Sequence, residues 1–197
     1  MIRAAIFDIG GVLLHSRNVE ATRARWEKRL GLTEGELWRV LPGIVARADS
    51  GELDEEAFWA EIAEALGAEG VIQELRDDAW WWDEVDAELV SFIASLRPQI
   101  LTGIISNAYA GAREFADRRH GLIAHFDTVV ISGEEGCVKP DERIYRIACE
   151  RLGVEPAEAV FVDDLRVNVE AARTLGMQGI QHRDTAETIA KLAELLR

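Results

Sequence analysis

Polar side chains that could act together in catalysis follow four short apolar runs of the sequence. They are Asp8 after residues 2–7, Ser106 and Asn107 after residues 101–105, Lys139 beyond residues 128–131, and Asp163, Asp164 and Asn168 after residues 159–162. Converging carboxylates repel each other unless a cation neutralises them, and Mg²⁺ is commonly held by one or two carboxylates with water and a substrate phosphate. A carboxylate can also attack phosphorus while a lysine steadies the phosphate oxygens. The set therefore indicates phosphoryl transfer, with Asp8 attacking and Lys139 stabilising charge.

Other catalytic signatures are absent from the sequence. It has no glycine-rich phosphate loop, no His-Glu-x-x-His, no Cys-x-x-Cys pair and no Gly-x-Ser-x-Gly elbow. The four histidines, His15, His120, His125 and His182, are scattered, so a histidine metal site is not expected. Taken singly, Asp8 could be a turn former, Asp163 a helix cap and Lys139 a solvated lysine. Their combination favours catalysis.

The elements that must position these residues follow from the hydrophobic pattern. Beyond Pro98, predicted strands at 101–105, 128–131, 159–162 and 178–181 alternate with helical patterns near 113–119, 141–152 and 167–175 and a last helix ending at Leu196. Residues 18–96 have mostly helical periods. Alternating strands and helices indicate a parallel sheet, in which ligands bind beyond the carboxyl ends of the strands. We predict a doubly wound α/β core from residues 1–16 and 97–197, with a helical cap domain at 17–96 inserted after the first strand.

Composition narrows the classes of function. The chain has 197 residues, 36 acidic and 22 basic, and a formal net charge of -14, which opposes binding to nucleic acid and to anionic membranes. Its two cysteines suggest reduced thiols, and no stretch approaches the ~18 apolar residues of a membrane span. We expect a cytoplasmic monomer or homodimer whose partner is a small molecule.

Four segments in order resemble the signature motifs of the haloacid dehalogenase-like (HAD) hydrolase superfamily. They are Phe7-Asp8-Ile9-Gly10-Gly11-Val12-Leu13, Ile105-Ser106-Asn107, Val138-Lys139-Pro140 and Val160-Phe161-Val162-Asp163-Asp164-x-x-x-Asn168. The resemblance covers essentially the whole chain and implies a Rossmann-like sheet of strand order 5-4-1-2-3 with a helical cap. Within the superfamily the chain looks most like small phosphatases with an Asp-x-Gly-Asn or Asp-x-Gly-Gly first motif, a branch that includes an α-D-glucose-1-phosphate phosphatase.

The resemblance also implies a role for each matching residue. Asp8 resembles the nucleophile and a metal ligand, and Lys139 the lysine of the third motif. The remaining roles are phosphate or substrate binding by Ser106, Asn107 and Gly11, Mg²⁺ binding by Asp164 and the backbone carbonyl of Gly10, and support by Asp163 and Asn168. The expected enzyme is a Mg²⁺-dependent phosphatase of small phosphorylated metabolites, with a sugar phosphate favoured, that works through an aspartyl phosphate.

Gly10 is the main departure from the family pattern, which usually has a second aspartate there. That aspartate protonates the leaving group and later activates water, and a positioned acid or base contributes ~10² to 10⁴ in rate. Glycine can do neither. The hypothesis that follows is that the enzyme favours phosphates whose leaving group departs easily, such as anomeric sugar phosphates or acyl phosphates, or recruits another proton donor such as His15.

Three other functions stay open at this stage. A 2-haloacid dehalogenase would use the same nucleophile without metal, although the Asp163-Asp164 pair argues against it. A catalytically reduced binding or regulatory module is compatible with Gly10. A phosphomutase would pass the phosphoryl group to a sugar hydroxyl. The three adjacent indoles of Trp80-Trp81-Trp82 cannot all face one core, so at least one is expected at the cleft between cap and core or in a surface contact.

Overall fold

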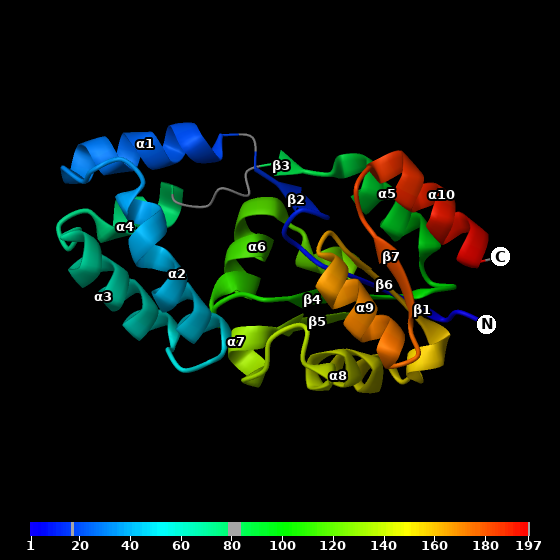
Figure 1. Ribbon diagram of the computed structural model, residues 1–197. Coiled ribbons are helices and arrows are strands. Elements are labelled where there is room, and N and C mark those ends of the chain that lie inside the picture. The colour runs from blue at the N-terminus through cyan, green and yellow to red at the C-terminus, as the bar shows by residue number, and fades with distance from the viewer. Residues whose placement is uncertain (17, 79–83, 197) are drawn as a thin grey trace.

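A five-stranded parallel sheet forms the centre of the computed structural model, which describes residues 1–16, 18–78 and 84–196 (Figure 1). Its strands stand in the order β5 (Thr128–Ile131), β4 (Leu101–Ser106), β1 (Ala4–Phe7), β6 (Ala159–Asp163) and β7 (Gln178–Gln181). Counted along the chain, this is the expected order 5-4-1-2-3, read from the other edge. Trp80-Trp81-Trp82, of which at least one was expected at the cleft or in a surface contact, lie outside the described residues.

The inner strands β1, β4 and β6 are buried almost throughout on both faces, as parallel sheets require, whereas the edge strand β7 is partly exposed. Along β1, Ala5 and Phe7 join one apolar cluster while Ala4 and Ile6 join another on the opposite face. The first face is covered by α5 (Ala87–Leu96) and α10 (Thr185–Leu195), with α6 (Ala112–His120) and η1 (Ile123–His125) beside them. The second is covered by α8 (Glu142–Leu152) and α9 (Arg166–Thr174). Short elements complete the core: α7 (Ser132–Glu135) and η2 (Pro156–Glu158).

A separate group of helices is inserted between β1 and β4. It consists of α1 (Val19–Leu30), α2 (Glu36–Asp49), α3 (Glu55–Leu66) and α4 (Ile72–Asp78), and Figure 1 shows it at the end of the sheet opposite both chain termini. Trp26, Leu37 and Phe58 are buried in a core of its own. Two short antiparallel strands, β2 (Leu14–His15) and β3 (Glu84–Val85), lead the chain into and out of the insertion.

The expected cap domain, residues 17–96, includes helix α5, but this helix packs on the core sheet. Its buried residues Leu89, Val90 and Ile93 pack in the cluster that covers the sheet, together with Phe7. An apolar helical face has the same period whichever domain it packs on, so the sequence pattern could not distinguish the two. We propose that the cap domain is restricted to α1–α4 and that α5 belongs to the core.

Two further expectations concern the cysteines and membranes. Cys137 and Cys149 are both free and buried. Burial raises the pKa of the Cys149 thiol to about 11, which leaves little reactive thiolate.

Among the described residues, no helix combines the length and apolar character that crossing a bilayer demands.

The carboxyl group of Asp49, the last residue of α2, should make the free energy of unfolding depend on pH. Burial raises the pKa of its carboxyl group from 3.8 to about 6. Between these values the folded chain binds more protons than the unfolded chain, so stability falls as the pH rises from about 4 to about 6. We expect Asp49→Asn to raise the free energy of unfolding by up to about 3 kcal/mol at about pH 7, since one pKa unit corresponds to about 1.4 kcal/mol.

Urea unfolding of the wild type and Asp49→Asn at about pH 7 and about pH 3 measures this difference. The gain should disappear at the lower pH, where Asp49 is protonated in both states. The matched control is Glu69→Gln, which amidates an exposed acid and should change little at either pH. An equal gain at both pH values would show that the charge of Asp49 is not its cause.

Candidate active site

Three carboxylates converge at the carboxyl ends of the two central strands β1 and β6. Asp8 follows β1, Asp163 is the last residue of β6, and Asp164 comes next. One carboxylate oxygen from each lies within 4.8 Å of the other two. The pairing of Phe7 with Val162 produces this convergence, and the Asp8 backbone N–H continues it by donating to the Val162 carbonyl at 2.9 Å.

Lys139 supplies the positive charge of the cluster. Its Nζ lies 2.8 Å from Asp8 Oδ1 and 2.7 Å from Asp163 Oδ2, and it donates to the Ile105 carbonyl at 3.2 Å. The side chain is 1% exposed. A buried ammonium needs such partners because isolation from water is costly for a charge. The sequence-predicted lysine is therefore in direct contact with the sequence-predicted nucleophile.

The two neighbouring aspartates have different surroundings. Asp163 is fully buried and accepts hydrogen bonds from Lys139, from Asn168 Nδ2 at 3.1 Å and from the Leu165 N–H at 2.8 Å. Its oxygens are thus occupied, and its contacts fix the lysine. Asp164 is partly exposed, and within the described part of the chain no other side chain donates to its carboxylate. Asp164 is the acid that remains available to a ligand.

The electrostatics of the cluster favour a cation. Burial raises the pKa of Asp8 to about 6, opposed by Lys139 and reinforced by the negative charge of Asp163. Burial, together with Asp163, also raises the pKa of Asp164. Three carboxylates share one ammonium, so the cluster carries excess negative charge when ionised. Oxygen ligands with this charge fit a hard divalent ion such as Mg²⁺.

Comparisons with known proteins decide the family. Residues 2–176 match the family model of the haloacid dehalogenase-like hydrolases. The chain belongs to this family. It is 26% identical over 205 residues to the D-ribitol-5-phosphate phosphatase of Bacteroides thetaiotaomicron, covering 100% of this chain and 99% of that protein.

Solved structures agree with the family assignment. A predicted HAD-like family hydrolase from Porphyromonas gingivalis superposes with a TM-score of 0.83 at 30% identity and covers 100% of this chain and 98% of that one. A HAD family enzyme from Bacteroides thetaiotaomicron, in complex with magnesium and inorganic phosphate, has a TM-score of 0.79 at 20% identity and covers 93% and 95%. At that identity the second comparison shows the shared fold alone.

In this HAD-like hydrolase, a tight turn after Asp8 brings the backbone against Asp164. The Leu14 N–H donates to the Ile9 carbonyl and the Gly11 N–H to the Leu14 carbonyl, each at 2.9 Å. Gly11 has a φ of +72°, and a Cβ built there would lie 2.8 Å from Asp164 Oδ2. Position 11 therefore requires glycine both for its conformation and for its distance from the acid.

The second predicted motif contacts the loop that carries Lys139. The Asn107 amide donates to the Lys139 carbonyl at 3.0 Å and accepts from the Lys139 N–H at 2.8 Å. Both ends of this side chain therefore hold the lysine loop, a use that the sequence did not indicate. Ser106, the last residue of β4, is 6% exposed, and its hydroxyl makes no hydrogen bond to the described residues.

Two residues near the site were missed by sequence reasoning. Tyr109 reaches into the core of the insertion, where its ring stacks on Phe58 with centroids 5.0 Å apart. Gly133 lies where three segments meet, since a Cβ there would be 2.8 Å from backbone atoms of Ala108, Ala110 and Ala48. No local pattern marks either position, because both depend on how the insertion sits on the loop after β4.

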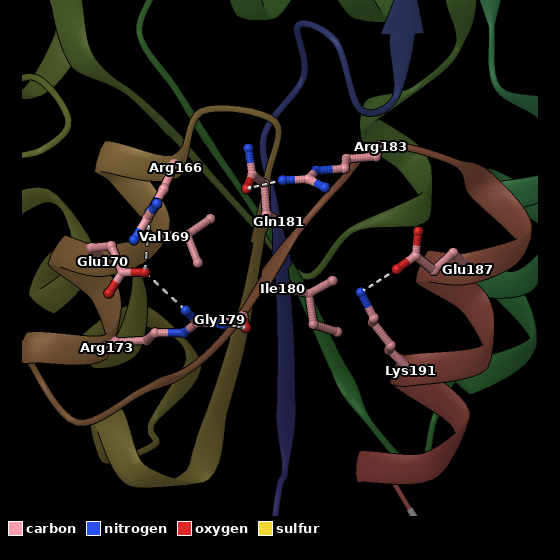
Figure 2. A pocket seen from close by; sticks show the side chains of 10 residues that line it. All are labelled: Arg166, Val169, Glu170, Arg173, Gly179, Ile180, Gln181, Arg183, Glu187 and Lys191. Carbon is pink, nitrogen blue, oxygen red and sulfur yellow. Dashed lines mark hydrogen bonds and ion pairs between the residues drawn. The ribbon is translucent and has the colours of Figure 1, made fainter.

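A pocket of about 410 Å³ lies elsewhere, between α9, β7 and α10. Figure 2 shows charged side chains around it, and three ion pairs join them: Arg173 with Glu170 at 2.9 Å, Arg166 with Glu170 at 3.8 Å, and Lys191 with Glu187 at 2.6 Å. Asp8, Lys139 and Asp164 do not line it. Four basic and two acidic side chains line it, and none of them belongs to the predicted site, so this pocket is separate from the carboxylate cluster.

Proposed function

We propose that this HAD-like hydrolase is a Mg²⁺-dependent phosphatase of small phosphorylated metabolites, with a sugar phosphate as the preferred substrate. The observation that carries the proposal is the convergence of Asp8, Asp163 and Asp164 within 4.8 Å, with Lys139 in contact with Asp8. The similarity to a D-ribitol-5-phosphate phosphatase supports both the reaction and the substrate class.

Asp8 is the proposed nucleophile. Its Oδ1 accepts hydrogen bonds from the Ile9 N–H at 2.7 Å and from Lys139, whereas Oδ2 has no donor among the described residues. Oδ2 therefore attacks phosphorus, the bond from phosphorus to the leaving oxygen breaks, and an aspartyl phosphate results. Water then attacks the phosphorus, which releases inorganic phosphate and restores the carboxylate.

The other residues position and stabilise the phosphoryl group. Lys139 neutralises charge on its oxygens, and Ser106 offers a hydroxyl to one of them. Because the Asn107 side chain is engaged with the lysine loop, we assign its contact with phosphate to the backbone. The Gly11 N–H is occupied by the Leu14 carbonyl, so we assign Gly11 no hydrogen bond to phosphate. Asp163 and Asn168 keep Lys139 in place.

Asp8, Asp164 and the Gly10 carbonyl are the proposed ligands of Mg²⁺. When bound there, the ion would neutralise the carboxylates and the developing phosphate charge. The similar magnesium and phosphate complex from Bacteroides thetaiotaomicron supports the choice of ion. A bound cation would also offset the burial and the like charge that raise the pKa values of Asp8 and Asp164.

The glycine at position 10 limits the classes of phosphate compound that the enzyme should hydrolyse fast. With no carboxylate at this position to protonate the leaving group, esters of acidic alcohols should be hydrolysed fastest. We therefore propose anomeric sugar phosphates and acyl phosphates as better substrates than simple alkyl phosphates. Gly10→Asp should raise the rate most for the alkyl esters, and an equal effect on aryl and alkyl phosphates would contradict this explanation.

A panel of phosphorylated metabolites, assayed for phosphate release with Mg²⁺ and with EDTA, tests the proposed function. We expect turnover of sugar phosphates with Mg²⁺ and loss of at least about 10²-fold with EDTA, comparable to the removal of one electrostatic stabiliser. Full activity in EDTA, or halide release from 2-haloacids in its place, would overturn the proposal. No turnover of any ester would favour the binding or regulatory module.

A further inference from the structure

Three side chains outside the carboxylate cluster meet beside the connections to the helical insertion. His15 lies on β2, Asp86 directly follows β3, and His182 directly follows β7. One ligand atom from each lies within 4.8 Å of the other two. The histidines are scattered in the sequence, but the fold brings two of them together from opposite ends of the chain.

The spacing of this cluster suits a small dication with nitrogen and oxygen ligands. His15 Nε2 lies 3.5 Å from Asp86 Oδ2. Ligands of a tetrahedral Zn²⁺, with bonds of about 2.1 Å, are about 3.4 Å apart. The rings of His15 and His182 lie nearly parallel at 24°, with their centroids 6.0 Å apart.

Neighbouring groups hold the two buried members in place. Thr188 Oγ1 lies 3.0 Å from His182 Nδ1, so Nε2 is the ring nitrogen of His182 that would bind a metal. Asp86 accepts from the Leu89 N–H at 2.9 Å and from the Thr185 hydroxyl. Metal-ligating histidines and carboxylates commonly have such outer partners, which orient them.

The partly exposed side chain of His15 gives a metal ion access to the cluster from solvent. The His15 side chain is 36% exposed, whereas that of Asp86 is 8% exposed. An ion could therefore enter from the His15 side, and water could occupy a fourth position. Two imidazoles with one carboxylate select ions of the zinc class, whereas Mg²⁺ prefers oxygen ligands.

We propose that His15, Asp86 and His182 form a second metal site, for a first-row transition-metal dication such as Zn²⁺. Two of the ligands lie at the connections that lead into and out of the insertion, and the third belongs to the core. A bound ion would tie both connections to the loop after β7. The proposal does not depend on the phosphatase function, since it uses none of the residues assigned to phosphate or Mg²⁺.

Metal titration of the full-length protein tests the second site. The chelator-treated chain is titrated with Co²⁺ in excess MgCl₂, and the visible absorption of Co²⁺ reports nitrogen ligation. Zn²⁺ affinity is then measured by competition with a chromophoric chelator. We expect one Zn²⁺ per chain and displacement of Co²⁺ by Zn²⁺.

Three variants locate the ion. His15→Asn changes a partly exposed residue, and Asp86→Asn preserves the N-cap of α5 because asparagine caps helices equally well. Each should weaken Zn²⁺ binding by at least about tenfold. His125→Asn, a histidine in η1 outside the cluster, is the matched control and should bind as the wild type does.

Asp8→Asn separates this site from the carboxylate cluster. Zn²⁺ binding that survives in Asp8→Asn and is lost in His15→Asn supports the second site. Binding that is lost in Asp8→Asn, binding unaffected by His15→Asn, or no binding by a folded wild type would overturn it. The last result would leave His15 and Asp86 as an ion pair without metal.

Discussion

Asp8→Asn is expected to lower the rate of phosphate-ester hydrolysis by at least about 10³-fold, because an amide oxygen is a poor nucleophile for phosphorus. The fold should survive, since the amide oxygen of the substituted side chain can still accept from the Ile9 N–H and from Lys139, and the substitution removes a buried charge whose largest contribution is its desolvation cost. Steady-state kinetics with the best substrate of the panel measure the loss, and circular dichroism verifies the fold.

The control for this substitution is Asp54→Asn. Asp54 is an exposed N-cap of α3, and asparagine replaces aspartate there with little change. Its activity should equal that of the wild type. Hydrolysis by Asp8→Asn at more than about a tenth of the wild-type rate would exclude Asp8 as the nucleophile.

Lys139→Met has the second large expected effect, on both catalysis and stability. It removes the ammonium that contacts Asp8 and Asp163 and leaves two buried carboxylates without it. Loss of one partner of a buried ion pair typically costs about 3–5 kcal/mol. Loss of a fixed positive charge at the reacting group typically costs about 10²–10³ in kcat.

Urea unfolding and steady-state kinetics separate these two effects. Lys191→Met is the matched control, because Lys191 is half exposed and pairs only with Glu187 among the described residues. It should change the free energy of unfolding by less than about 1 kcal/mol.

If Lys139→Met folds poorly, Asp163→Asn still tests the arrangement, since it leaves the ammonium present but removes the carboxylate that holds it. Wild-type kcat in either variant would show that the placement of Lys139 is not catalytic.

The fold could be predicted because its signals are local. The inner strand β1 and its neighbour β6 are short apolar runs with an acidic residue at or just beyond the end, so Asp8 and Asp163 could be placed at strand ends from the hydrophobic pattern. The order of the strands came from the family resemblance. The proposed transfer of α5 from the cap to the core could not be predicted, since an amphipathic helix does not show from its own sequence which layer it covers.

The candidate site could be predicted where residue type coincides with a strand end or with the segment beyond it. Asp164 and Lys139 were placed in this way, but the double hydrogen bond between Asn107 and the lysine loop was not, because it joins two loops distant in sequence. The packing of Tyr109 into the insertion and the meeting of His15 with His182 have the same cause. Contacts between distant segments leave no periodic trace in the sequence.

Trapping of the phosphoenzyme tests most directly that Asp8 captures phosphorus. Wild-type protein is mixed with a substrate carrying labelled phosphate, quenched in acid within one turnover and digested for peptide mapping. The label should lie on the peptide that contains Asp8, be released by hydroxylamine as an acyl phosphate is, and be missing from Asp8→Asn. Label on another residue, or label that persists in Asp8→Asn, would contradict the mechanism.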